Sequence, residues 1–239
     1  MLIRALALTP ALVLAGCFME MHHDVGFEDI EEDIHTVVIE VETGEVQLVP
    51  AQDGDTVVDW EVHWSRRCPD IDVYTSEGTL YVRGHCPVGA WNCGTDFRIQ
   101  VPEGADVEAK VTTGELDLEG VGSVYAELTT GELNIRDATG DLDLDVTTGG
   151  IHAFDLTSEE LRASLVTGSM ELELDAPFDL VNAELVTGDI TIAVPEGCYD
   201  MELDVLTGAV STDGVSCDCE ASSEIRAEVI TGTIDIYGE

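Results

Sequence analysis

The stretch ELRASLVTGSMELELDAPFDLVNAELVTGDITIAV, residues 160–194, contains the pattern that decides the fold. It holds two copies of one unit, each centred on a Thr-Gly pair, at 167/168 and 187/188. On both sides of each pair, apolar residues alternate with polar ones, as in ELEL at 171–174. An alternation of period two is typical of a half-buried β-strand. Each unit is therefore predicted to be two short strands, apolar inward and acidic outward, that meet at the Thr-Gly pair.

The same unit recurs along most of the chain. From Gly114 onward, successive glycines of the pairs are separated by 17, 18, 19, 20, 20 and 24 residues. The residues three before and two after each glycine are apolar in every unit. The glycines are Gly44, Gly114, Gly131, Gly149, Gly168, Gly188, Gly208 and Gly232. The threonines of the regular units are Thr113, Thr130, Thr148, Thr167, Thr187, Thr207 and Thr231.

Units of this length predict an all-β solenoid. Two strands of a 17-to-20-residue unit cannot bury their apolar face alone, so the copies must stack on one another. Before each glycine the apolar residues stand at odd offsets from it, and after it they stand at even offsets. This shift predicts a corner at the pair, which glycine can adopt. The preceding threonine is predicted to face inward, where stacked hydroxyls would form a ladder. A twisted β-sandwich is the competing arrangement, but the identical placement of Thr-Gly in every unit favours parallel stacking at about 4.8 Å.

The N-terminus has the layout of an export signal. Residues 1–17, MLIRALALTPALVLAGC, carry one charge and then an apolar stretch too short to span a membrane. The closing Leu-Ala-Gly-Cys resembles a bacterial lipobox, which implies a signal peptide at 1–16 and lipidation at Cys17. An ordinary signal peptide cleaved elsewhere is the alternative. Phe18, not Asp, follows the cysteine, and the resemblance then favours the outer membrane of a Gram-negative cell envelope.

The rest of the chain divides into three parts. Residues 17–34 are acidic and irregular and are interpreted as a tether. Residues 35–103 contain one Thr-Gly unit and then less regular strands, and are predicted to be the atypical, capping end of the solenoid. Residues 104–239 form the regular repeat. Val-Pro-Glu-Gly occurs at 101–104 and 194–197, where the proline should end one strand and the glycine should turn into the next.

Repeated strand-Thr-Gly-strand units, led into by Val-Pro-Glu-Gly, resemble the bacterial putative-adhesin β-solenoid family. The resemblance covers about residues 30–238. It implies an exported or membrane-anchored protein with a right-handed β-helical fold and a role in surface interaction, and it supplies no catalytic residue. The acidity and the cysteines of this sequence depart from common members of that family.

The charge balance limits the partners. The chain has 9 Lys and Arg against 50 Asp and Glu, a formal net charge of −41, and its one lysine is Lys110. Nucleic acid is excluded as a partner, because phosphate contacts require clustered basic residues. The expected partners are the membrane, through the lipid, and envelope proteins or polysaccharide.

The cysteines fit an oxidising compartment, and they fall into two groups of three beyond Cys17. Cys198 is predicted to pair with Cys217 or Cys219, which lie in a loop inserted in the longest repeat. The other group, Cys68, Cys86 and Cys93, predicts one bridge, with Cys86 and Cys93 flanking a turn. Each group leaves one thiol over.

No metal site or cofactor is predicted. His85-Cys86 with Cys93, or His22-His23-Asp24, offers metal-ligand residue types, but neither has the spacing of a ligand quartet. Disulfides and exposed histidines are the favoured interpretation. Outward acids such as Asp141, Asp143 and Asp145 predict at most weak, diffuse calcium binding.

No catalytic motif is present, so a non-catalytic envelope protein is predicted. The sequence lacks a nucleophile elbow, a His-Glu-x-x-His zinc motif and a phosphate-binding glycine loop. The alternative is a carbohydrate-active enzyme, a polysaccharide lyase or hydrolase, since solenoids can host such activities. A concave groove that places Arg98, Arg136 or Arg162 beside carboxylates would favour this alternative.

Overall fold

The structure is a computed structural model that describes residues 21–52, 54–216 and 221–238. Strands account for all the regular secondary structure of these residues, which confirms the all-β class, and none of them forms a helix that could cross a membrane. Thirteen strands make one sheet, and two short ones make a second. The strands are β1 (His22–Ile30), β2 (Thr36–Pro50), β3 (Thr56–Trp64), β4 (Asp70–Ser76), β5 (Thr79–His85), β6 (Gly94–Val101), β7 (Asp106–Glu119), β8 (Val124–Arg136), β9 (Leu142–Leu156), β10 (Glu160–Leu174), β11 (Leu180–Val194), β12 (Gly197–Cys198), β13 (Asp200–Asp213), β14 (Val215–Ser216) and β15 (Glu224–Gly238).

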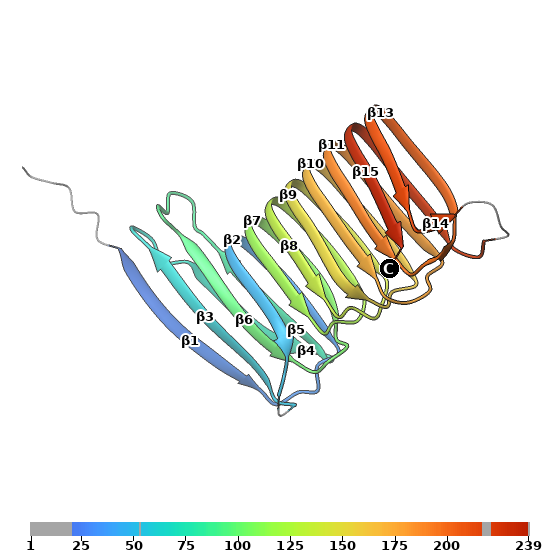
Figure 1. The fold of residues 1–239 in the computed structure, drawn as a ribbon. Helices are drawn as coiled ribbons and strands as arrows, with labels where there is room; N and C mark the ends of the chain where they lie inside the picture. Colours follow the sequence, from blue (N-terminus) through green and yellow to red (C-terminus); the bar gives the residue numbers. More distant parts are fainter. Residues whose placement is uncertain (1–20, 53, 217–220, 239) are drawn as a thin grey trace, which may run out of the picture.

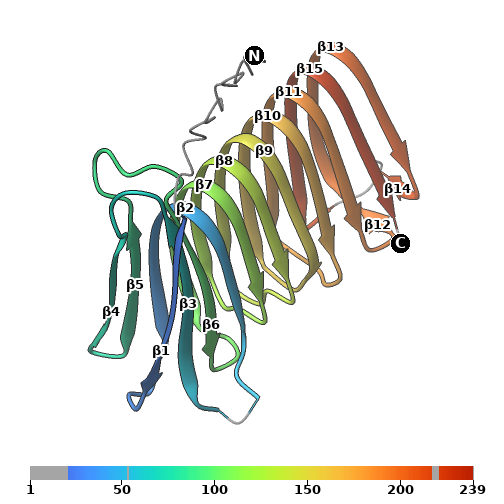
Figure 2. The same ribbon diagram turned by 90° about the vertical axis from the view of Figure 1, so that its left-hand side faces the viewer.

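Eight long strands form a solenoid-like stack of parallel rungs, namely β2, β7, β8, β9, β10, β11, β13 and β15. Each has a Thr-Gly pair near its middle and bends over, so its two halves lie on opposite sides of the stack (Figure 1). Loops at the lower edge lead from one rung to the next (Figure 2). Proline ends the preceding strand at both Val-Pro-Glu-Gly sequences, since β6 stops at Val101 and β11 at Val194.

The glycines of the eight pairs lie in one column, because each pairs with the glycine of the neighbouring rung. All eight have φ between 140° and 150°. Adjacent glycines are very close: a Cβ added to Gly168 would lie 1.6 Å from the carbonyl oxygen of Gly149. Both the backbone angle and the lack of space require glycine at these corners.

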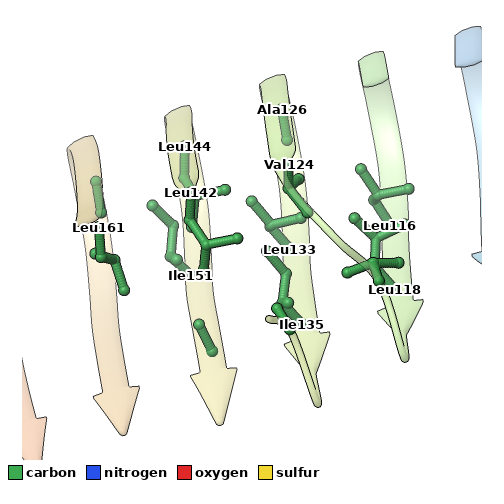
Figure 3. Close-up of a cluster of buried hydrophobic side chains, with 14 of the residues drawn as sticks. Leu116, Leu118, Val124, Ala126, Leu133, Ile135, Leu142, Leu144, Ile151 and Leu161 are labelled. Atoms are coloured by element: carbon green, nitrogen blue, oxygen red, sulfur yellow. The ribbon is translucent and has the colours of Figure 1, made fainter. Parts of the chain in front are cut away.

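The hydrophobic core fills the space between the two halves of each rung. Leu165, Met170 and Leu172 of β10 are buried, while Arg162 and Glu171 are exposed. The same alternation holds on the other inner rungs, so apolar side chains form rows that run from strand to strand. Figure 3 shows such a row: Leu116, Leu133 and Ile151 on β7, β8 and β9.

The threonines of the pairs face solvent, which corrects the predicted inward ladder. All eight are exposed, and the residue before each, such as Val166 or Thr112, is exposed or half-buried. The inward-facing positions therefore shift by one residue at the corner, because two successive residues face outward just before the glycine. The hydroxyls gain no shelter at the corner, and the glycine backbone alone makes the close contact between rungs.

The rungs do not follow the sequence at the C-terminal end. β15 lies between β11 and β13, so the glycine column runs Gly188, Gly232, Gly208. The gap of 24 residues was expected to insert a loop into an otherwise sequential stack. Instead, the longer connection lets the chain turn back, and β15 fills the position that β13 left open beside β11.

Beyond β2 the two halves of the stack continue separately. The first half of β2 pairs with β5, which is antiparallel to β4. The second half pairs with β6, followed by antiparallel β3 and β1. Residues 35–103 thus form a cap with antiparallel strands and only one true rung, β2. Within this cap the buried Thr95 takes the position of the next glycine, with its carbonyl oxygen 2.0 Å from a Cβ added to Gly44.

The segment expected to be an irregular tether is largely a strand. Residues 22–30 form β1, paired with β3 over its whole length. Val25 and Phe27 alternate with polar residues, but they lie on the outer face of the sheet and are exposed. The signal-peptide residues 1–16 and Cys17 lie outside the described residues.

Candidate functional site

The parallel register sets the outer faces of the stack in order. Residues at the same offset from the glycine lie side by side, so the outward side chains form rows across the rungs. On the second half, the position after the glycine is Glu45, Glu115 and Glu132 on β2, β7 and β8. Two positions later in the same rungs stand Gln47, Asp117 and Asn134. These two adjacent rows, six residues with four carboxylates in all, are together called the acidic row below.

Repulsion within the acidic row is partly relieved by Asn134. Its amide donates to Glu115 Oε1 at 3.0 Å and to Asp117 Oδ1 at 2.7 Å. Burial raises the pKa of Glu115, and the charges of Asp117 and Glu45 raise it further. Neutralising this carboxyl by a proton or by a cationic partner is therefore easier than for an isolated glutamate.

His152 extends the same face toward β10. Its Nε2 lies 3.3 Å from Glu132, and its Nδ1 lies 3.5 Å from Glu171 on the next rung. Gly150 makes room for this arrangement, because a Cβ there would lie 2.2 Å from the Glu132 carboxylate and 2.6 Å from the His152 ring. Gly149 thus makes the corner, and Gly150 leaves room for the Glu132 and His152 side chains.

The opposite face carries the one lysine in a polar cluster. Lys110 Nζ lies 2.6 Å from Glu127 Oε2, and the Tyr125 hydroxyl donates to Glu127 Oε1 at 2.6 Å. These hydrogen bonds, from Lys110 first, lower the pKa of Glu127. In return, Glu127 raises the pKa of Lys110 and raises that of Tyr125 to about 12. Lys110 on β7 is therefore paired with Glu127 on the adjacent rung β8.

A large groove lies over the outer face of β1, β3, β6 and β2. Its volume is about 500 Å³. Two cross-strand rows line it: Val25, Glu61, Asp96 and Glu45 in one, and Asp59, Arg98 and Gln47 in the other. The groove therefore meets the acidic row at Glu45 and Gln47.

Hydrogen bonds fix several groove side chains. Asp96 Oδ1 accepts from the backbone N–H of Glu45 at 2.7 Å, and Glu61 Oε1 lies 2.7 Å from His23 Nε2. Arg98 donates through Nη1 to Gln47 Oε1. Arg98 is the one basic side chain among the residues that line this groove, and it stands among four carboxylates. The site can bind a hydroxyl-rich or cationic ligand through planar polar groups.

The three arginines singled out in the sequence are not brought together. Only Arg98 lines the large groove. Arg136 lies by Asp117 and Glu119 in a hollow of about 160 Å³, and its guanidinium lies over the Phe154 ring. Arg162 lies on the other half of its rung and pairs with Glu160 at 2.7 Å.

The predicted N-terminal disulfide is confirmed. Cys86 is bonded to Cys93, and Cys68 is a free, exposed thiol. Their sulfurs are therefore not available with His85 as metal ligands, and His85 instead pairs with Glu42 at 2.8 Å. Cys198 is disulfide-bonded, whereas Cys217 and Cys219 lie outside the described residues.

The other metal-ligand candidates are spread apart. His22 stacks on Trp64, and His23 pairs with Glu61. Asp141, Asp143 and Asp145 point outward one after another along β9 and the residue before it. In the part of the chain that the structure describes, no three His, Cys, Asp or Glu side chains are grouped to hold a metal ion.

Comparison with known proteins identifies the fold. No family model and no curated protein matches the sequence. Among solved structures, a putative lipid binding protein from Parabacteroides distasonis is similar, with a TM-score of 0.51 and 12% identity over 89% of this chain and 96% of that chain. The likeness is one of fold.

Two bacterial proteins with adhesion-related descriptions also match. A putative cell adhesion protein from Clostridium sporogenes has a TM-score of 0.41 and 13% identity, over 91% of this chain and all of that chain. A putative adhesin from Bacteroides fragilis has a TM-score of 0.38 and 14% identity, over 90% and 97%.

Proposed function

We propose that this chain is a non-catalytic cell-envelope lipoprotein, anchored through Cys17 to the outer membrane, that presents an acidic solenoid for adhesion or scaffolding. The observation that carries the proposal is the alignment of outward side chains at one offset over successive rungs. A rigid face with a repeated spacing can contact an extended partner at several points at once, and such contacts reinforce one another.

The test combines a deletion strain with a variant of the acidic row. Glu45→Gln, Glu115→Gln and Glu132→Gln together remove three charges without changing side-chain size. We expect this variant to lose adhesion or capture of envelope components, as the deletion does. A matched control removes three exposed acids at the far end of the first half: Asp200→Asn, Glu202→Gln and Asp204→Asn. Normal adhesion and unchanged capture in the deletion strain, with and without a calcium chelator, would contradict the proposal.

A carbohydrate-active enzyme is the second candidate, and the groove around Arg98 is the observation that bears on it. The groove fulfils the condition of an arginine beside carboxylates in a concave surface. A lyase needs a base for proton abstraction, and Arg98 is a poor base because a guanidinium stays protonated in proteins. Binding of a saccharide without turnover therefore agrees better with the groove. Cleavage of any member of a polysaccharide panel, abolished by Arg98→Gln, would establish the enzyme instead.

A further inference from the structure

Two neighbouring loops in the cap differ from the rest of the molecule in composition. Residues 65–69 (SRRCP) follow β3, and residues 86–93 (CPVGAWNC) precede β6. Neither contains an acidic residue, although the chain has 50 Asp and Glu among 239 residues. Arg66 and Arg67 supply two of its nine basic side chains at adjacent positions. These two segments are called the basic loop pair.

Specific contacts hold the basic loop pair together. The backbone N–H of Ser65 donates to the Trp91 carbonyl at 2.9 Å, and the Asn92 amide donates to Ser65 Oγ at 3.2 Å. Arg67 donates to the Val88 carbonyl at 3.1 Å. The Cys86–Cys93 disulfide closes the second loop. The pair is therefore one built surface.

Its exposed side chains combine positive charge with apolar area. Val88 is 90% exposed and Trp91 is 55% exposed. The Arg66 guanidinium lies 5.6 Å from the centre of the Trp91 ring, and both arginines are exposed. Tryptophan and arginine beside a protruding aliphatic residue are the side chains that suit the interface of an anionic bilayer.

The start of the described chain lies beside these loops. His22 pairs with Trp64, the residue just before Ser65, and their rings stack at 5.5 Å. Five positions separate His22 from Cys17, and a fully extended segment of that length reaches about 18 Å at most. The beginning of β1, the end of β3 and the start of β6 lie at one end of the cap, and the sheet order places β13 at the opposite end of the stack (Figure 1).

We propose that the basic loop pair docks on the anionic surface of the membrane that holds the lipid at Cys17. This inference rests on the proposed lipid anchor, which confines the loops near the bilayer. Trp91 and Val88 enter the interface, Arg66 and Arg67 contact lipid phosphates, and the acidic stack projects away from the like-charged surface. The loops would then fix the orientation of the rod.

The test measures the depth of Trp91 in vesicles. Mature chain purified from envelopes is reconstituted in phosphatidylglycerol vesicles that contain brominated lipid, and the Trp91 signal is taken as the difference between wild type and Trp91→Phe. We expect that signal to be quenched, and quenching to fall for Val88→Ser, which removes no observed contact. Arg66→Gln with Arg67→Gln should reduce the ratio of docked to free loops about 25-fold, because each basic residue contributes about fivefold at an anionic surface. Arg136→Gln with Arg162→Gln is the matched control and should change nothing.

The outcomes separate the two proposals. The mass of the purified chain tests the lipid at Cys17 independently of the quenching. If the lipid is absent, the same chain is added to the outside of the vesicles, and Trp91 quenching still tests the loops. An unquenched Trp91 on vesicle-bound protein would overturn the docking. Equal binding of the loops to a soluble polyanion such as heparin, without quenching, would also overturn it and point to an anionic polymer as the partner.

Discussion

At the scale of the residue, the corner glycines are the strictest requirement of the fold. Gly168 has φ of 146°, and its stacked neighbour leaves no space for a Cβ. Gly104 also has a positive φ, 80°, but a Cβ there would meet nothing within 4 Å. Gly104 therefore shows the cost of a left-handed backbone angle alone, whereas Gly168 combines a less accessible angle with the contact between rungs.

We predict that Gly168→Ala lowers the free energy of unfolding by roughly 3–5 kcal/mol, since strain and overpacking add. Gly104→Ala should cost only about 1–2 kcal/mol, the price of the left-handed conformation alone. Urea unfolding followed by circular dichroism measures both. Equal losses for the two variants would mean that the rungs do not approach each other closely at the corner.

The Lys110–Glu127–Tyr125 cluster gives a second prediction at this scale. The hydrogen bond to the Glu127 carboxylate stabilises the protonated phenol, so the pKa of Tyr125 is about 12. We expect the tyrosinate absorbance of wild type minus Tyr125→Phe to rise near that pH. Glu127→Gln should move this component back toward the ordinary value of 10.0. A Tyr125 component that ionises at the same pH with and without Glu127 would contradict the hydrogen bond.

At the scale of the element, β13 differs from the other rungs. Among the described residues it pairs only with β15, and its inward residues Leu203 and Val205 are half-buried where their counterparts are buried. Leu206 is 77% exposed. The last rung therefore has the least packing to hold it.

We predict that amide hydrogens of β13 exchange fastest among the rungs and those of β9 slowest, because local opening is easiest where burial is least. Hydrogen exchange with mass spectrometry on the intact protein measures this order. Sequential stacking would put β15 at the open end, so faster exchange in β15 than in β13 would contradict the observed strand order.

The Cys86–Cys93 bridge is the second element to test. It closes a short loop, and Cys86→Ser with Cys93→Ser should lower stability by roughly 2 kcal/mol through the entropy of the unfolded chain. Thermal unfolding of this pair, with Cys68→Ser as the control, measures the effect. A loss no larger than that of the control would mean that the loop is already ordered by its contacts with Ser65 and Arg67.

The sequence predicts these elements unevenly, for physical reasons. The eight rungs and their buried rows follow from a period-two pattern repeated around each Thr-Gly pair. Each rung was predicted as two short strands, whereas the structure has one continuous strand that bends at the glycine. The order of β13 and β15 in the stack was not predictable, because the two strands have the same apolar pattern, with Val205 and Val229 at equivalent positions, and either could pack against β11. Strand β1 also went unpredicted: Val25 and Phe27 do alternate, but acids surround them and they face solvent. Arg98 was named from the sequence as a groove candidate, but the other side chains of the groove were not, since they come from four strands.

At the scale of the whole molecule, the structure combines an acidic stack with an acidic cap that carries one basic patch, at Arg66 and Arg67. The groove and the acidic row adjoin on one face at Glu45, and the basic loop pair lies next to the groove, at the edge where β1 and β6 start and β3 ends. A molecule docked by the loops would hold its acidic rungs away from the membrane, where an envelope or cell-surface partner can reach them.

The central claim is that eight glycine corners form one column, with Gly232 between Gly188 and Gly208. Nitroxide pairs at the exposed threonines test it in a Cys68→Ser background in which the thiol left over in the Cys198 group is also replaced by serine. The comparison is between Thr187→Cys/Thr231→Cys and Thr187→Cys/Thr207→Cys. Adjacent strands lie about 4.8 Å apart and next-but-one strands about 9.6 Å apart, so the first pair should show the stronger dipolar broadening. Stronger broadening for the second pair, or none in either, would contradict the column.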